Sequence, residues 1–120
     1  MRCIPFDCPD KQRGWLICKA ESGNIVALGT GAGIYLFRKD SDIALPPLDG
    51  RYSNDSPYTM PPGFNFLTKL GRSTVRSLAF VADGQTIVAG LYDDTQVWEK
   101  DSQTAFRLRT IISVDDSADD

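Results

Sequence analysis

Two stretches of the chain, 61 residues apart, show the same order of turns and apolar runs. Residues 23–29 align without a gap with residues 84–90, and residues 34–41 align with residues 95–102. The identical positions include two pairs of glycines and the tripeptide Lys-Asp-Ser that ends each copy. Repetition at a fixed spacing is the signature of proteins that stack copies of one supersecondary unit. The sequence therefore predicts two units of similar shape.

Each copy has the pattern of short antiparallel strands joined by tight turns. In the second copy, residues 75–80, 86–90 and 95–98 are β-favouring runs, and the turn signal Asp83-Gly84 separates the first two. No part of the chain shows a sustained period of 3.6 residues with helix caps. We therefore expect an all-β fold of antiparallel four-stranded meanders with essentially no helix.

The middle strand of each copy is a continuous apolar run rather than an alternating one. Residues 25–28 and 87–89 are apolar throughout. Such runs are typical of strands that are buried on both faces. We therefore expect each sheet to lie between neighbouring layers, and the two end faces of a two-unit stack to meet water unless other chains cover them.

A proline-rich insertion separates the copies. Residues 43–63 hold five of the seven prolines, and proline removes the N–H that a strand ladder needs. Residues 64–70 then resume as a strand, and residues 106–112 look like the corresponding strand after the second copy. The chain accordingly divides into an N-terminal segment (1–12), a first unit (13–42), the insertion (43–63), a second unit with its following outer strand (64–113) and an acidic tail (114–120).

Composition and charge exclude several functions. The chain has no histidine, which removes every mechanism that needs an imidazole base or ligand. Its 13 basic and 16 acidic residues give a formal charge of −3, and the acidic tail carries that excess, so the sequence argues against a nucleic-acid partner. The N-terminus lacks the apolar core of a signal peptide, and no run is long enough to span a membrane. We expect an intracellular protein, cytoplasmic or nuclear, without membrane attachment.

The three cysteines do not form a metal-binding pattern. Cys3, Cys8 and Cys18 lack the spacing of a Cys-x-x-Cys pair, and a zinc site would need a fourth ligand. A disulfide between Cys3 and Cys8 is an alternative in a secreted protein. Free thiols in a reducing compartment are the favoured interpretation.

Three further motifs have an ordinary structural reading. The glycine-rich residues 29–33 precede a β-favouring run instead of the helix that a dinucleotide site needs, so they predict a turn. Asp93-Asp94 predicts another turn rather than a metal site. Alternating Arg107 and Arg109 predict a charged outer strand rather than a nucleic-acid groove. We therefore assign no catalytic, cofactor-binding or metal-binding residues.

Other side chains are assigned by their surroundings in the sequence. Trp15 and Trp98 lie within strand patterns and are expected to pack between layers rather than to bind a partner. Ser113 and Ser117 each precede an acidic residue by three positions, which is a weak pattern for acidophilic kinases.

Residues 67–100 resemble a blade of the WD-repeat β-propeller family, and residues 15–40 resemble one less closely. The match includes Trp98-Glu99 where the family favours Trp-Asp. Gly71-Arg72 replaces the family's Gly-His, which leaves its hydrogen-bond network incomplete. The resemblance implies a partial ring of about two blades.

The resemblance also implies a function. Blades of this family are mostly non-catalytic platforms for other proteins, so we expect a protein-interaction or scaffold module, with other proteins or further blades as partners. Two alternatives stay open, namely part of a propeller-scaffold enzyme and a truncated remnant without independent function. Partners of such platforms usually meet the turns and long loops, which here carry the candidate partner-binding residues Arg72, Tyr92, Asp93, Tyr52 and Tyr58.

Overall fold

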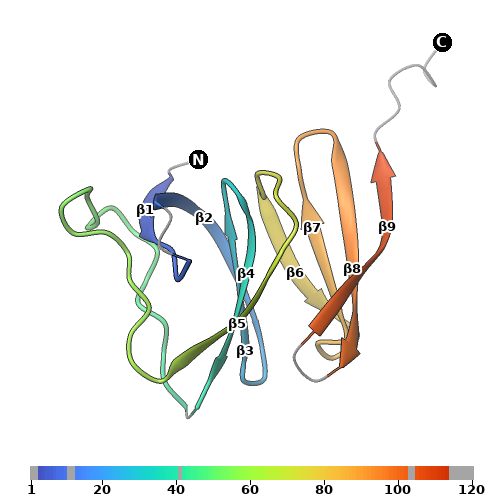
Figure 1. Ribbon diagram of the computed structural model, residues 1–120, viewed down its shortest axis with the longest axis horizontal. Coiled ribbons are helices and arrows are strands. Elements are labelled where there is room, and N and C mark those ends of the chain that lie inside the picture. Colours follow the sequence, from blue (N-terminus) through green and yellow to red (C-terminus); the bar gives the residue numbers. More distant parts are fainter. Residues whose placement is uncertain (1–2, 11–12, 41, 103–104, 114–120) are drawn as a thin grey trace.

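The chain folds into two antiparallel β-sheets that lie face to face (Figure 1). The computed structural model describes residues 3–10, 13–40, 42–102 and 105–113, and within these ranges it contains nine strands and no helix. The all-β prediction is thereby confirmed for the described residues. The first sheet has the order β1-β2-β3-β4-β5, with bounds Ile4–Asp7, Arg13–Ser22, Ile25–Thr30, Gly33–Lys39 and Phe64–Leu70. The second has the order β6-β7-β8-β9, with bounds Ser77–Val81, Thr86–Gly90, Asp94–Ser102 and Ala105–Ser113.

The two sheets repeat each other down to an irregularity in their strand pairing. The register between β4 and β5 shifts between Leu36 and Phe37. The register between β8 and β9 shifts between Val97 and Trp98, which lie 61 residues further along the chain. A bulge bends and twists its strand locally. The two units therefore share the same local shape, as the aligned sequences predict.

The sheets do not coincide with the sequence units at one boundary. Strand β5 pairs with β4, so residues 64–70 form the outer strand of the first sheet and not the start of the second. Strand β9 has the same place beside β8. The N-terminal segment contributes an additional edge strand, β1, which pairs with β2 and for which the sequence gave no indication. Pro5 is tolerated there because an edge strand needs a ladder on one side only.

A hydrophobic core joins the two sheets. Gly29 in β3 lies so close to the second unit that a Cβ at this position would stand 2.9 Å from Val75 Cγ1 and 3.2 Å from Leu78 Cδ1. Trp98 is buried here, as expected, whereas Trp15 is 48% exposed. The buried members of this core are Ala27, Ile34, Leu36, Leu70, Val75, Ile87, Ala89, Trp98 and Phe106.

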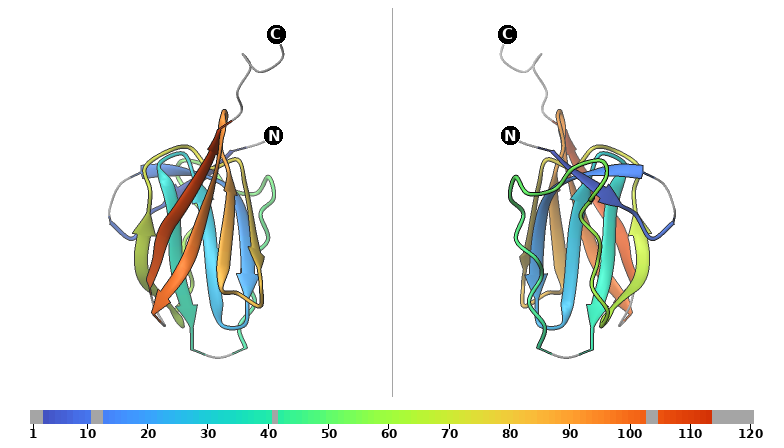
Figure 2. Two further views of the ribbon diagram at one scale, coloured as in Figure 1. Left: turned by 90° about the vertical axis from the view of Figure 1, so that its right-hand side faces the viewer. Right: turned by 90° about the vertical axis from the view of Figure 1, so that its left-hand side faces the viewer.

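A second core covers the opposite face of the first sheet. The insertion 43–63 and β1 lie across this face, in front of the strands in the right-hand view of Figure 2. The sequence predicts that both ends of the stack meet water, but the structure covers this one. Its buried members are Ile4, Phe6, Cys8, Leu16, Val26, Leu28, Tyr35, Phe37, Leu45, Tyr58 and Phe64.

The turn between β6 and β7 is longer than a two-residue hairpin. Ala82, Asp83 and Gly84 all have positive φ, at 55°, 56° and 85°, and the Gly84 N–H donates to the Val81 carbonyl. Glycine adopts such a conformation at little cost, but an alanine there is strained. In the part of the chain that the structure describes, no helix is long and apolar enough to cross a membrane. The acidic tail, with Ser117, lies outside the described residues.

Candidate functional site

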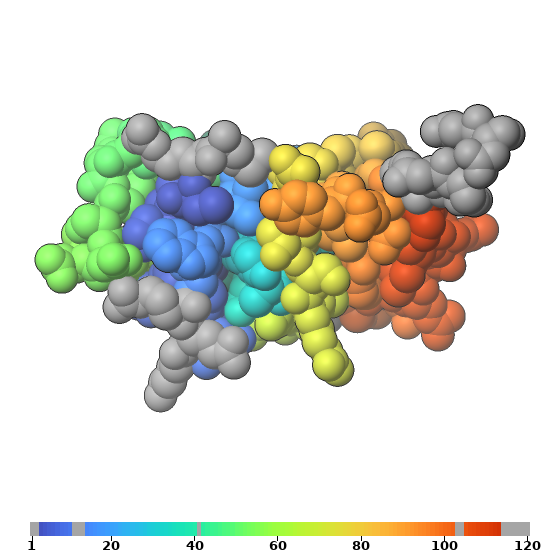
Figure 3. Space-filling model, turned by 90° about the horizontal axis from the view of Figure 1, so that it is seen from above, coloured from blue at the N-terminus to red at the C-terminus, as the bar shows by residue number. Residues whose placement is uncertain are grey.

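Three of the five candidate partner-binding residues line one pocket at an end of the molecule. The turns β3–β4, β5–β6 and β7–β8 meet there, and Figure 3 shows them in cyan, yellow and orange. The pocket has a volume of about 380 Å³. It is lined by Gly31, Arg72, Ser73, Thr74, Leu91, Tyr92, Asp93 and Asp94. The sequence therefore identified residues from two separate turns that the fold brings together.

Hydrogen bonds between the turns hold the pocket in shape. The Thr74 hydroxyl donates to the Gly31 carbonyl at 3.0 Å, and the Val75 N–H donates to the Thr30 carbonyl at 2.9 Å. Within the β7–β8 turn, the Leu91 N–H donates to the Asp94 carbonyl at 2.8 Å. The backbone of the pocket is thus fixed by bonds that connect both sheets.

The side chains on the pocket rim are suited to protein contacts. Tyr92 is 73% exposed, and the Arg76 guanidinium lies over its ring at 4.5 Å from the centroid. This cation–π contact orients a large amphipathic side chain that otherwise meets water. Arg72 and Asp93, also exposed, add one charge of each sign. An aromatic ring flanked by charges is typical of protein-binding surfaces.

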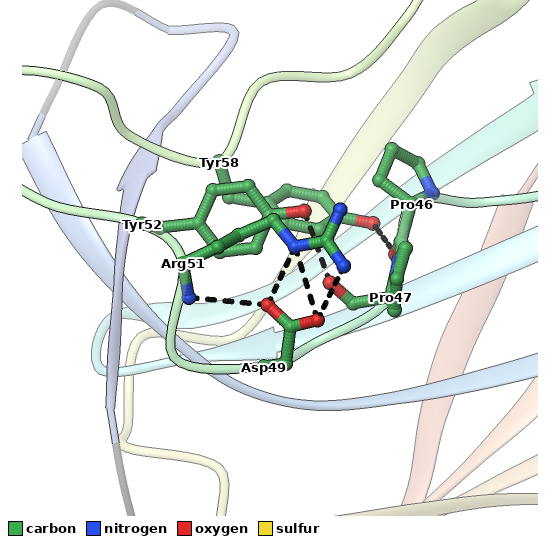
Figure 4. Close-up of polar contacts among 6 residues, drawn as sticks. All are labelled: Pro46, Pro47, Asp49, Arg51, Tyr52 and Tyr58. Carbon is green, nitrogen blue, oxygen red and sulfur yellow. Dashed lines mark hydrogen bonds and ion pairs between the residues drawn. The ribbon is translucent and has the colours of Figure 1, made fainter.

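The other two candidates, Tyr52 and Tyr58, lie together in the insertion, far along the chain from the pocket (Figure 4). Their rings pack edge to face with centroids 5.1 Å apart. Tyr58 is completely buried, and its hydroxyl donates to the Pro46 carbonyl at 2.8 Å. Burial raises the pKa of the Tyr58 phenol, so it stays a neutral donor. In this conformation Tyr58 contacts the core of the first sheet and no outside partner.

An exposed apolar face of the second sheet is a further candidate that the sequence reasoning missed. Cross-strand pairing places one row of side chains, Ala79, Val88, Val97 and Thr110, on the side of the sheet that points away from the first. The left-hand view of Figure 2 looks toward this side. Val81 and Ile112, in the flanking rows, are 45% and 58% exposed. We call the side chains Ala79, Val81, Val88, Thr95, Val97, Thr110 and Ile112 the docking face.

The docking face corresponds to a buried face of the first sheet. The aligned register pairs Val88 with Ala27 and Val97 with Leu36, and both of these first-sheet residues are fully buried against the second sheet. Thr95 in turn corresponds to Ile34. The 61-residue alignment was the signal that could have identified this face, because a repeated strand presents equivalent residues on equivalent sides.

The charged outer strand forms an internal ion pair. Arg109 donates to the Glu99 carboxylate across β8 and β9, which leaves Arg107 as the neighbouring exposed cation of the predicted strand. A pair of this kind blunts an exposed sheet edge, as expected. The structure thus gives these arginines a place at the end of the docking face.

The cysteines are free, so the Cys3–Cys8 disulfide alternative is not formed. Cys8 is buried, and burial raises the pKa of its thiol. Among the described residues, no three His, Cys, Asp or Glu side chains are grouped so that they could hold a metal ion. The chain matches no protein-family model, no curated protein and no solved structure.

Proposed function

We propose that the chain is a non-enzymatic protein-interaction module made of two WD-repeat-like propeller blades, which docks a further β-sheet on its second sheet. One observation carries the proposal. The docking face is exposed in the second unit, whereas the equivalent face of the first unit is buried against a sheet. The repeat itself therefore describes the expected partner, which is another sheet of the same kind.

The energetics favour docking over permanent exposure. Complete burial of a valine or isoleucine side chain stabilises by about 1.5–3 kcal/mol. Val81 and Ile112 are each about half exposed, so a partner sheet would gain part of that energy at each position. Thr95 and Thr110 on the same face lower the cost of exposure, so the free chain stays stable while it is unbound. Such a face is suited to a partner that is a separate chain or a further part of a longer protein.

The pocket at the end of the sheets is the second contact surface in this proposal. Partners that cover the docking face reach the pocket rim, because the β7–β8 turn connects two strands of that face. Tyr92 and Arg72 would then contribute the anchoring contacts, since aromatic and arginine side chains carry much of the binding energy in protein interfaces.

A site-specific crosslink tests the proposal. A photo-reactive amino acid replaces Thr95 on the docking face or, in the control, exposed Lys19 of β2. Irradiation of cells should give a defined adduct from position 95 only, and mass spectrometry should map it to a β-strand segment with alternating apolar residues. Val97→Lys should abolish the adduct, while Arg72→Glu and Tyr92→Ala should weaken it. Equal labelling from the two positions would reject the proposal.

The same experiment separates the alternatives. A remnant without independent function gives no specific adduct from either position. A part of a propeller-scaffold enzyme gives an adduct with a protein whose activity depends on this chain, which an assay with and without the chain detects. An interaction module gives the adduct without that dependence.

A further inference from the structure

The insertion 43–63 covers a face that resembles a sheet-packing face. Val26, Leu28 and Phe37 are buried beneath it and belong to one core with Leu45 and Tyr58 of the insertion. The aligned residues of the second unit are Ile87, Ala89 and Trp98, which pack against the first sheet. The insertion therefore occupies the place where a neighbouring sheet would otherwise lie.

The insertion is held by bonds at its centre and at its ends. The Tyr58 N–H donates to the Pro5 carbonyl at 2.7 Å, and the Asp7 N–H donates to the Tyr58 carbonyl at 3.0 Å. These bonds attach the insertion to β1 as a parallel bridge does. At the ends, the Asp40 N–H donates to the Gly63 carbonyl at 2.8 Å. Tyr58 is thus fixed from both sides of its backbone and, through its hydroxyl, to Pro46.

The prolines explain how an irregular segment can lie on an apolar core. A buried loop normally carries N–H groups that need hydrogen-bond partners. A proline has no N–H to satisfy, and it loses less conformational entropy when the chain folds. The prolines of the insertion are Pro46, Pro47, Pro57, Pro61 and Pro62. This composition, which marks a break in the sheet pattern, also suits a segment that has to cover a sheet without joining it.

We infer that residues 43–63 together with β1 form a fixed end cap, so that the stack accepts a partner sheet at one end only and copies of the chain cannot join head to tail. The inference rests on the proposed docking at the second sheet. Without the cap, the Val26–Leu28–Phe37 face of one copy would match the docking face of another, as the two units of one chain match now. Repeated contacts of this heterologous kind give rings or open filaments.

The test uses two full-length chains. In the first, a Gly/Ser linker of equal length replaces residues 44–60, and Val97→Lys blocks its own docking face. The second is the unaltered chain. Analytical ultracentrifugation of the mixture should show a 1:1 complex, and the complex should disappear when the second chain also carries Val97→Lys. Ser102→Lys, at the exposed end of the same strand, is the matched control and should leave the complex intact.

Two outcomes overturn the inference. One is a cap-replaced chain that keeps its β-sheet circular dichroism spectrum but does not bind the unaltered chain. The other needs no cap-replaced protein. If the unaltered chain alone forms oligomers that grow with concentration and vanish with Val97→Lys, the cap does not block head-to-tail contacts. A crosslinked partner at position 95 without a 1:1 complex would reject the cap and retain the proposed function. The complex without a crosslinked partner would reject the proposed function and retain the cap.

Discussion

Leu70 and Ile112 occupy the same position in the two sheets, yet Leu70 is 5% exposed and Ile112 is 58% exposed. Leu70 pairs with Ile34 and Ile112 pairs with Thr95, and these partners are 61 residues apart. The difference in burial has one cause, which is that the second sheet covers the first and no described segment covers the second. The pair therefore measures, within one chain, what a neighbouring sheet contributes.

The first prediction uses this pair. Leu70→Ala should lower the free energy of unfolding by about 2–5 kcal/mol, because it leaves a cavity between the sheets. Ile112→Ala should cost less than about 1 kcal/mol in the isolated chain, since the side chain is already in water. Urea denaturation at low protein concentration measures both. Equal costs would mean that Ile112 is covered in solution.

A second prediction concerns the spacing between the sheets. A Cβ at Gly29 would lie 2.5 Å from Cys18 Sγ and 2.9 Å from Val75 Cγ1, so Gly29→Ala should force the sheets apart. Overpacking of this kind costs about 1–3 kcal/mol. Gly31, two residues on, has nothing within 4 Å of the added atom, and Gly31→Ala should change stability by less than about 0.5 kcal/mol. Thermal melts of both variants, with nearly equal midpoints, would contradict the close approach.

The third prediction compares two tyrosines of the cap. Tyr58→Phe removes a hydroxyl that donates to the Pro46 carbonyl from a buried ring, and it should cost about 0.5–1.5 kcal/mol. Tyr52→Phe removes a similar bond to the Pro47 carbonyl at the surface, where water replaces the lost donor. Its cost should be smaller. Urea titrations of the two variants supply the comparison, and the reverse order would show that Tyr58 is not the anchor of the cap.

Much of the fold could be predicted because the repeat carries its own control. The continuous apolar run 25–28 predicts burial on both sides, and the structure buries Val26 in one core and Ala27 in the other. The strand after Gly33 follows from the β-favouring run that a dinucleotide site would not have. Local patterns of this kind need no knowledge of distant contacts.

The remaining features depend on contacts between distant segments. Pro5 conceals β1, because proline lowers the strand signal wherever it stands, although an edge position tolerates it. Tyr58 lies between prolines and acids in a stretch that suggests an exposed loop, but it is the deepest residue of the cap. In the candidate site, Arg72 and Tyr92 were identifiable as turn residues, whereas the docking face required knowing which sheet covers which.

The last prediction concerns alkaline pH and Cys18. Burial raises the pKa of the Cys18 thiol from 9.0 to about 11 in the folded chain, with a smaller opposing effect from a hydrogen bond with the Gly29 backbone. The folded state therefore holds the proton where the unfolded state has lost it. The stability that this thiol provides is complete below pH 9 and falls between pH 9 and about 11, by at most about 1.4 kcal/mol per pH unit. Cys18→Ala should flatten that part of the profile.

Urea denaturation of the two proteins between pH 8 and about 10.5 measures the effect. Burial also raises the pKa values of Tyr35 and Tyr58, so both proteins should lose stability at the alkaline end. The difference between the two curves isolates the contribution of Cys18, whose Sγ lies 3.9 Å from the Val75 carbonyl oxygen at the junction of the sheets. Curves that stay parallel from pH 8 to the alkaline end would mean that the thiol meets water, and hence that the two sheets are not packed together at this point.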